Sequence, residues 1–331
     1  MATTVGSLVL EVEDLCVDYL TDRGAVRAVE RVSLEVARGE FLGIVGESGC
    51  GKSTLLFAIA RLLSPPAQIS AGRVRFEGRD MVSMSEGELR HHRWRDYSVV
   101  MQSAMNALNP VLTIGAQLKD VIEAHERRSS SEIRQRSQEV LRLVGIDPVH
   151  LQSYPHQLSG GMRQRAMIAM ALVFTPDLVI MDEPTSALDV VAQRSLMMQI
   201  KELQRKFGFA AIFVTHDMSL VSHFSDRLAV MYAGQIVEVG PTRKVFAEPK
   251  HPYTVGLMRS FPSIRGPLQP LVGIAGAPPD LAHPPRGCRF HLRCASVMAR
   301  CTVEEPEFYP READLVRCFL FDPRAEPAGR G

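Results

Sequence analysis

The chain has 331 residues, 46% of them hydrophobic, and a formal net charge of +1 at neutral pH. This length and apolar content allow a sizeable core, and we expect two structural units. The balanced charge leaves no basic footprint for nucleic acid, so we expect no nucleic-acid partner. No apolar run reaches 18 residues, and the start carries acidic residues rather than the basic ones of a signal peptide. We therefore expect a cytosolic protein that reaches a membrane only through partner subunits.

Three segments in the first 60 residues predict a β-rich start followed by a nucleotide-binding turn. Residues 8–19 and 26–37 have the composition of β-strands, and the apolar run 41–45 predicts a buried parallel strand. The next segment reads GESGCGKST and fits the phosphate-loop pattern, and a helix is expected over residues 53–60. A strand, a glycine-rich turn and a helix N-terminus are the context that this motif needs.

The phosphate loop predicts a site for a nucleoside triphosphate and Mg²⁺. Glycines let backbone N–H groups approach the phosphates, and the helix N-terminus adds positive potential there. Lys52 can reach the β- and γ-phosphates, Ser53 can supply its hydroxyl to Mg²⁺, and Thr54 can bond a neighbouring phosphate oxygen. The residues of this loop that we expect to bind the nucleotide are Gly46, Ser48, Gly49, Gly51, Lys52, Ser53 and Thr54.

A second strand ends in two carboxylates. Residues 178–181 are apolar and are followed by Asp182 and Glu183. At the C-terminal end of a buried strand, Asp182 is placed to orient Mg²⁺, and Glu183 should point toward the γ-phosphate.

Residues 158–165, just before that strand, read LSGGMRQR and narrow the class of nucleotide site. This segment resembles the signature sequence of ATP-binding cassette (ABC) ATPases. The resemblance implies an α/β P-loop NTPase cassette with a RecA-like core, an antiparallel β subdomain and an inserted helical subdomain. It also implies that two cassettes enclose ATP head to tail, so that Ser159, Gly160 and Gly161 contact the ATP bound by the opposite subunit.

Further residues match the motifs of this family. The resemblance implies that Glu183 polarises the attacking water, that Gln102 contacts the metal and the water, and that His216 contacts the γ-phosphate. Residues 186–189 match the D-loop, with Asp189 expected at the dimer interface, and Tyr19 is expected to stack on adenine. Glu183, His216 and Gln102 are therefore the expected catalytic residues, and Ser53 and Gln102 the expected Mg²⁺ contacts.

The chain divides into a cassette, residues 1–245, and a C-terminal extension, residues 246–331. The helical subdomain is expected at about 103–158, with a helix over 131–144, and strands 227–232 and 235–239 are expected to form a hairpin. Residues 249–287 are rich in Pro and Gly and predict an extended linker on the surface. Two segments resemble those of the oligopeptide/dipeptide importer ATPases: residues 249–254, which read PKHPYT, and residues 103–110, which read SAMNALNP. The second segment has Ala104 where that subfamily usually has proline.

Four cysteines cluster in the extension: Cys288, Cys294, Cys301 and Cys318. Disulfides are unfavoured in a cytosolic protein, and the closely spaced pair that is typical of zinc sites is missing from this sequence. Some members of the peptide-importer subfamily carry a [4Fe–4S] cluster at matching cysteines. We expect such a cluster, with zinc or four ordinary thiols as the alternatives.

Charged groups beside three cysteines lead to two smaller predictions. Arg293 and Arg317 each precede a ligand cysteine and either offset thiolate charge or are ordinary surface arginines. Cys50 lies in the phosphate loop, where Lys52 and the helix N-terminus predict a lowered pKa.

The resemblance implies the ATP-hydrolysing subunit of an ABC importer for di- or oligopeptides, peripheral on the cytoplasmic face of the cell membrane. The implied partners are a second, paralogous ATPase, two transmembrane permeases and, indirectly, an extracytoplasmic solute-binding protein. Nickel chelates and oligosaccharides remain alternative solutes. A soluble ABC ATPase without a transport role, or a redox-sensing module, are alternatives of another class.

Overall fold

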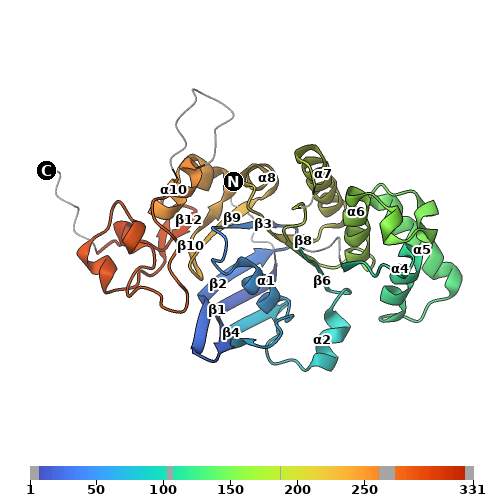
Figure 1. Cartoon of the computed structure of the whole chain (residues 1–331), viewed down its shortest axis with the longest axis horizontal. Helices are drawn as coiled ribbons and strands as arrows, with labels where there is room; N and C mark the ends of the chain where they lie inside the picture. Colours follow the sequence, from blue (N-terminus) through green and yellow to red (C-terminus); the bar gives the residue numbers. More distant parts are fainter. Residues whose placement is uncertain (1–6, 103–106, 187, 261–272, 325–331) are drawn as a thin grey trace. The chain divides into compact units, whose positions relative to one another are not determined.

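The structure is a computed structural model that describes residues 7–102, 107–186, 188–260 and 273–324 (Figure 1). Two compact units alternate along the chain. Unit 1 takes residues 1–10, 35–41 and 75–215, and unit 2 takes residues 11–34, 42–74 and 216–331. The division into a cassette and an extension at residue 245 stays a prediction. No helix in the described ranges is long and apolar enough to cross a membrane.

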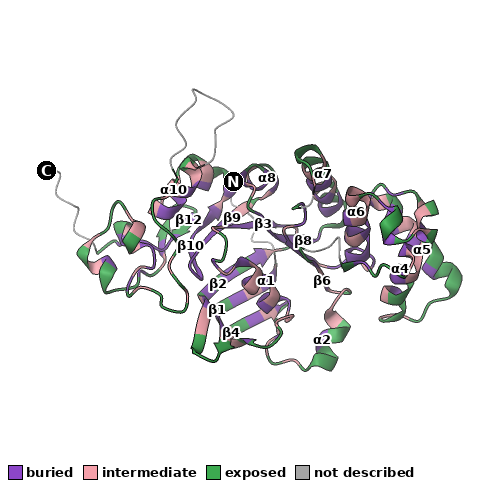
Figure 2. Ribbon diagram, viewed as in Figure 1, coloured by how far each residue is buried: buried purple, intermediate pink, exposed green. Residues whose placement is uncertain are grey.

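Unit 1 is built on a short parallel sheet. Its strands, in the order β8-β7-β6, are β8 (Ala210–Val214), β7 (Leu178–Asp182) and β6 (Tyr97–Val100). The register pairs Val179 with Ala211 on one side and with Ser98 on the other. Every residue of β7 and β8 is buried, and the ribbon of β8 is purple in Figure 2. Strands that are covered on both faces need continuous apolar runs, and this explains why the sequence predicted both.

The described part of unit 1 also contains helices. They are α2 (Glu86–His92), α4 (Ile114–Glu123), α5 (Ser130–Leu143), α6 (Gly160–Ala171) and α7 (Val190–Phe207), with 3₁₀ turns at Pro148–Gln152 and Pro155–Gln157. Ser129 and Glu132 form a capping box that begins α5. This helix confirms the one predicted over 131–144. Residues 103–106, where the predicted helical subdomain and the importer-like segment begin, lie outside the described residues.

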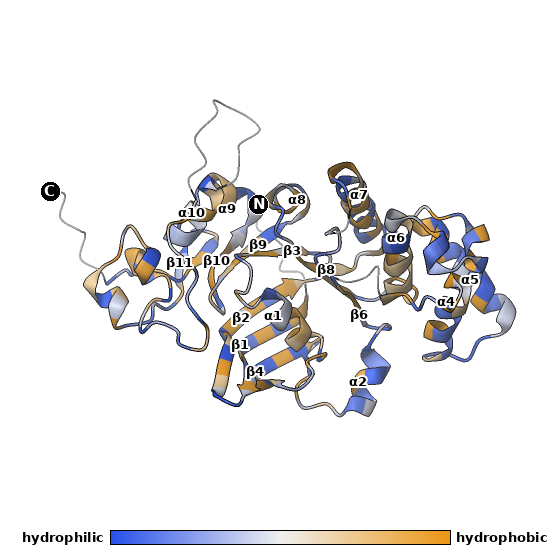
Figure 3. Ribbon diagram, viewed as in Figure 1, coloured by the Kyte–Doolittle hydropathy of each residue, from blue (hydrophilic) through white to orange (hydrophobic). Residues whose placement is uncertain are grey.

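The antiparallel sheet lies mostly in unit 2. Its strands in this unit follow the order β2-β1-β4, with β1 (Leu8–Thr21), β2 (Gly24–Ala37) and β4 (Ala67–Phe76); the end of β4 pairs with β5 (Arg79–Asp80) in unit 1. Figure 3 shows hydrophobic and hydrophilic residues alternating along β1 and β4. Such alternation places one face of a sheet against a core and the other toward solvent. The two predicted β-rich stretches are confirmed.

A second group of strands in unit 2 begins at the phosphate loop and ends in the C-terminal segment. Their order is β3-β9-β10-β12-β11, with β3 (Phe41–Val45), β9 (Arg227–Tyr232), β10 (Gln235–Pro241), β12 (Asp314–Val316) and β11 (Tyr309–Arg311). β3 is parallel to β9, and β9 and β10 form the predicted hairpin. β12 pairs antiparallel with β10, so that Val239 faces Leu315.

The helices of unit 2 correct one prediction. They are α1 (Lys52–Ile59), α8 (Met218–Phe224), α9 (Thr242–Ala247) and α10 (Pro252–Arg259). α10 falls inside the residues predicted to form an extended linker. Pro252 occupies the first turn, where its missing N–H costs nothing, and the His251 side chain accepts from the N–H of Tyr253. Tyr253, Thr254 and Leu257 are buried, which explains why a proline-rich segment forms a helix here. Residues 261–272 of that segment lie outside the described residues.

Candidate functional site

The predicted site residues are divided between the two units. The phosphate loop, Tyr19 and His216 belong to unit 2, whereas Gln102, Asp182, Glu183, the signature residues and Asp189 belong to unit 1.

The phosphate loop in unit 2 has a backbone that only glycine fits at two points. Gly46 and Gly51 have φ angles of 156° and 104°. A Cβ at Gly46 would lie 2.1 Å from the carbonyl oxygen of Met231, and one at Gly51 would lie 2.4 Å from that of Ala28. The close approach of these backbones fixes the path of the loop from β3 into α1. The N-terminus of α1 therefore follows the loop directly, as an anion site requires.

Lys52 lies back over the loop that precedes it. Its Nζ donates to the carbonyl oxygens of Gly46 and Glu47 over 2.8 and 2.9 Å, and it lies 3.7 Å from the sulfur of Cys50. Although Lys52 belongs to a helix, its ammonium group is therefore held within the loop. This position is consistent with a lysine that contacts phosphates.

Burial overturns the prediction for Cys50. Its side chain is 5% exposed, and burial raises the pKa of the thiol, although the charge of Lys52 acts in the opposite direction. Cys50 therefore packs as a small apolar residue and is not an activated thiolate.

Tyr19 lies beside the first turn of α1. Its hydroxyl forms a hydrogen bond of 3.1 Å with the Thr54 hydroxyl, and its side chain is half-buried. The structure thus brings the predicted adenine contact next to the phosphate loop. Ser53 is half-buried in the same turn, and Ser48 and Gly49 are exposed on the loop. His216 is exposed directly before Asp217, which caps α8 through the N–H of Ser219.

In unit 1, the structure brings two of the three predicted catalytic residues together. The Gln102 side chain donates from Nε2 to Oε2 of Glu183 over 2.8 Å. Glu183 has a φ of 45°, a left-handed conformation that is uncommon for glutamate, and its N–H donates to Val214 across the end of the sheet. Asp182, the last residue of β7, is only 2% exposed. The structure thus places two neighbouring carboxylates at the end of β7, the second of which accepts from Gln102. Their roles toward metal and water stay predictions.

The signature residues begin α6. Ser159 is the N-cap, and its hydroxyl accepts from the N–H of Met162 over 3.3 Å. Among the residues that the structure describes, a Cβ at Gly161 would meet only a Leu188 methyl carbon at 4.0 Å, so there is open space beside this glycine. Asp189 caps α7 by accepting from Val191 and Ala192. Its observed role is therefore structural, and its place at a dimer interface stays a prediction; Ala187 of the same D-loop lies outside the described residues.

The four tail cysteines lie in one small cluster. The N–H of Cys288 donates to the carbonyl of Cys301 over 2.9 Å, and Cys301 packs with Tyr309 and Phe319. Burial raises the pKa of Cys288 to about 11 and that of Cys318 to about 12, and the neighbouring thiols add to both shifts. In the described part of the chain, all six cysteines are free thiols. Within the same residues, no set of three His, Cys, Asp or Glu side chains is close enough to hold one metal ion.

The arginines beside these cysteines have other partners. Arg317 donates to the carbonyl of Arg31 over 3.4 Å, and its guanidinium lies 4.6 Å from the centre of the Phe308 ring. Arg293 is 6% exposed and pairs with Glu47 of the phosphate loop. Neither arginine is an ordinary surface residue. The position of Arg293 directly before Cys294 draws attention to this arginine, but nothing in the sequence indicates its contact with Glu47.

Comparisons with known proteins agree with this geometry. Residues 29–186 match the ABC transporter family model, and residues 237–301 match that of the oligopeptide/dipeptide transporter C-terminal region. A dimeric ATP-binding cassette bound to ADP and Pi in a post-hydrolysis state matches with a TM-score of 0.64 at 28% identity, over 71% of this chain and 99% of that one. A second structure, cbiO1 of Clostridium perfringens, matches with a TM-score of 0.63 at 30% identity, over 73% of this chain and 91% of that one. The fold and site thus define an ABC ATPase.

Two curated relatives narrow the class. The dipeptide transport ATP-binding protein DppD of Bacillus subtilis is 44% identical, over 97% of both chains. The oligopeptide transport ATP-binding protein OppD of the same organism is 42% identical, over 96% of this chain and 90% of the relative. The chain belongs to the ATP-binding subunits of the oligopeptide/dipeptide ABC importer family.

Proposed function

We propose that this chain hydrolyses ATP to drive the import of di- or oligopeptides through membrane permeases. The contact between Gln102 and Glu183, next to the buried Asp182, carries the catalytic part of this proposal. The match of residues 237–301 to the oligopeptide/dipeptide transporter C-terminal region, together with the names of the relatives, supports the peptide substrate.

The reaction is the transfer of the γ-phosphoryl group of ATP to water. Lys52 and the loop N–H groups hold the phosphates, and Tyr19 stacks on adenine. Ser53, Gln102 and Asp182 would hold Mg²⁺, which when bound would neutralise charge on the phosphates. Glu183 accepts a hydrogen bond from the attacking water and orients it, while His216 contacts the γ-phosphate. Gln102 holds the Glu183 carboxylate in place for this role.

A complete site needs a second subunit. Ser159, Gly160 and Gly161 form a helix N-terminus in unit 1, and a helix N-terminus favours an anion. We propose that this end closes on the ATP of a paralogous ATPase, with Asp189 at the interface. Two permeases hold the pair on the cytoplasmic face of the membrane, and a solute-binding protein delivers the peptide from outside.

The experiment is ATP hydrolysis by the importer assembled in proteoliposomes, with and without its solute-binding protein. Peptide-loaded binding protein should stimulate hydrolysis, and Glu183→Gln should abolish the stimulation. Nickel chelates and oligosaccharides are tested in the same assay. Stimulation only by one of these would transfer the proposal to that solute, and hydrolysis without any membrane partner dependence would favour a soluble ABC ATPase.

We also propose that Cys288, Cys294, Cys301 and Cys318 hold a [4Fe–4S] cluster. Four cysteine thiolates are the ligand set of a [4Fe–4S] cluster, and these four thiols lie near enough to raise one another's pKa. The closely spaced cysteine pair that is typical of a zinc site is missing from this sequence. A bound cluster would cross-link the short segments of the extension.

Iron analysis of protein purified without oxygen tests this part. We expect about four irons per chain and a brown colour. Cys318→Ser should lose both, whereas the matched variant Cys16→Ala, which alters a cysteine of β1 outside the four-cysteine cluster, should keep them. Stoichiometric zinc, or no metal at all, would contradict the proposal.

A further inference from the structure

One residue of the phosphate loop, Glu47, is held by the C-terminal extension. Its N–H donates to the hydroxyl oxygen of Tyr253 over 2.9 Å, and its carboxylate accepts from both terminal nitrogens of Arg293 over 2.8 and 3.0 Å. Lys52 binds its carbonyl oxygen from within the loop. Glu47 therefore has a defined partner for each of its polar groups: its backbone N–H, its carboxylate and its backbone C=O.

Arg293 is itself fixed before it reaches Glu47. Its Nε donates to the carbonyl of Ala275 over 2.9 Å, and its terminal nitrogens also donate to Ile274 and to the Tyr232 hydroxyl. With a side chain 6% exposed and a two-pronged contact, it has the geometry in which an arginine–carboxylate pair is strongest. An arginine held this way presents its fork in one orientation only.

Tyr253 is fixed equally well. Its ring is fully buried and lies 4.5 Å from the ring of Tyr232 and 5.5 Å from that of Phe290, measured between centres. His251 caps the start of its helix, and the N–H of His251 donates to buried Glu238 over 2.8 Å. The His-Pro-Tyr segment therefore aims one hydroxyl at the phosphate loop.

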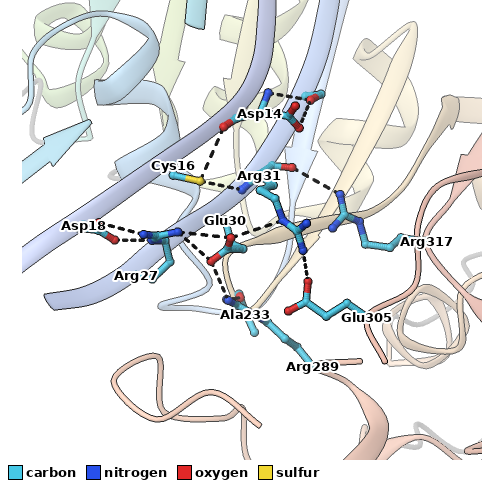
Figure 4. Close-up of polar contacts among 11 residues, drawn as sticks. Asp14, Cys16, Asp18, Arg27, Glu30, Arg31, Ala233, Arg289, Glu305 and Arg317 are labelled. Atoms are coloured by element: carbon cyan, nitrogen blue, oxygen red, sulfur yellow. Dashed lines mark hydrogen bonds and ion pairs between the residues drawn. The ribbon is translucent and has the colours of Figure 1, made fainter. Parts of the chain in front are cut away.

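The extension is anchored around this point by further ion pairs in unit 2 (Figure 4). Arg289 donates to the carbonyl of Ala233 and pairs with Glu30, and Arg31 pairs with Glu305. The turn that Arg289 binds is also tied to the phosphate loop, because the N–H of Gly234 donates to the carbonyl of Cys50 over 2.8 Å. The extension thus contacts both the phosphate loop and the turn at Ala233 and Gly234 to which that loop is hydrogen-bonded.

We propose that the extension sets the position of the phosphate loop, and that Tyr253 and Arg293 are positioning residues for nucleotide binding which act through Glu47. The inference deepens the proposed function and rests on it, because it needs ATP to bind this loop. Nothing in it requires that the cysteines hold a metal.

The physical reason is that a loop binds phosphate through N–H groups that point to one place. When Glu47 loses a partner, the loop samples orientations that do not bind phosphate. The apparent affinity then falls in proportion to the fraction of molecules whose loop remains competent to bind. We expect about a tenfold rise in the Kd for MgATP, which corresponds to about 1.4 kcal/mol.

The test compares the full-length variants Arg293→Met, Arg293→Lys and Glu47→Gln with the control Arg311→Met, an exposed arginine of the same extension. MgATP binding, kcat and KM in the assembled importer, the melting temperature and the iron content are measured for each. We expect Arg293→Met and Glu47→Gln to raise Kd and KM about tenfold with kcat within about twofold, and the lysine variant to recover part of the affinity. The double variant Arg293→Met/Glu47→Gln should bind MgATP no more weakly than the single variant that has the higher Kd.

Further measurements distinguish a failure of the positioning role from a failure of the chain to bind ATP. If Arg293→Met fails to fold, Tyr253→Phe removes only the oxygen that accepts from Glu47 and should still weaken binding. Lower melting temperatures with unchanged Kd and KM would overturn the positioning role. Wild-type protein that binds no ATP would instead overturn the proposed function.

Discussion

The carboxylate of Glu47 and the guanidinium of Arg293 form a two-pronged ion pair between residues 246 positions apart in the sequence. Their side chains are 24% and 6% exposed, so the arginine depends on this partner more than the glutamate does. Removing the glutamate leaves a buried cation without its counter-ion, which is more harmful than losing the pair as a whole. This contact therefore links the folding of the extension to the conformation of the phosphate loop.

Glu183→Gln should bind ATP normally and hydrolyse it poorly. The amide keeps the shape of the side chain but cannot accept a proton from water, so turnover should fall by about two to four orders of magnitude. Steady-state hydrolysis by the assembled importer, together with the Kd for MgATP, checks this. Turnover near the wild-type value would remove Glu183 from the catalytic role.

Lys52→Ala should show the opposite pattern. The ammonium group that lies over the Gly46 and Glu47 carbonyls is lost, and with it a charge that faces phosphate. We expect the Kd for MgATP to rise at least about tenfold. Equilibrium titration with a fluorescent ATP analogue measures the effect, and AMP, which lacks the outer phosphates, serves as the control ligand. Unchanged ATP affinity would contradict the assignment of this loop.

Acid should destabilise the chain through His251. Burial lowers the pKa of this imidazole from 6.5 to about 3, so between these values the unfolded chain binds a proton that the folded chain does not. The stability that His251 contributes is complete above pH 6.5 and is lost as the pH falls, by about 1.4 kcal/mol per pH unit. Urea unfolding at pH 7.5, 6.5 and 5.5 measures the slope.

His251→Asn provides the comparison, because asparagine can still cap α10 and does not titrate. Its unfolding free energy should depend less on pH than that of the wild type. The matched control is His283→Asn, at a side chain that is 88% exposed, and it should leave the slope unchanged. Equal slopes in all three proteins would show that His251 does not titrate on unfolding.

Cys50 should react slowly with maleimides. Its thiol is buried and its pKa is raised, so little thiolate is available at pH 7. We expect labelling of the native protein to be at least about tenfold slower than labelling in urea, where the free thiol has its usual pKa of about 8.5. Mass spectrometry of the labelled peptide gives both rates, and fast labelling of the native chain would show that the loop opens around this residue.

The parts of the fold that depend on local patterns were predictable. β3, β7 and β8 are continuous apolar runs, and the phosphate loop joins a strand to a helix as its glycines require. The hairpin at Ala233 and Gly234 followed from its turn residues. Such features are encoded by neighbouring residues, so a single sequence is enough to find them.

Contacts between distant residues were not predictable in the same way. All the ATP-binding motifs precede the extension in the sequence, so no role in nucleotide binding was predicted for it. In the structure, however, Tyr253 and Arg293 of the extension both contact Glu47 of the phosphate loop. The position of Cys50 next to a lysine indicated an activated thiol, but its burial decides the direction of the pKa shift. Proline-rich composition indicated a linker, but the cap provided by His251 and the burial of Tyr253 favour a helix. Side-chain burial and contacts between distant residues determine these three features, and the spacing of residues in the sequence shows neither.

The pairing of β12 with β10 bears on how this protein is produced. A chain cut after residue 245 would keep β10 but lose the strand that covers its outer side at Glu238 and Val239. The exposed N–H and C=O groups of such an edge recruit other strands, and its buried residues would face water. An isolated cassette should therefore aggregate or exchange strands between copies, and expression trials should keep residues 309–316 in every version of the chain.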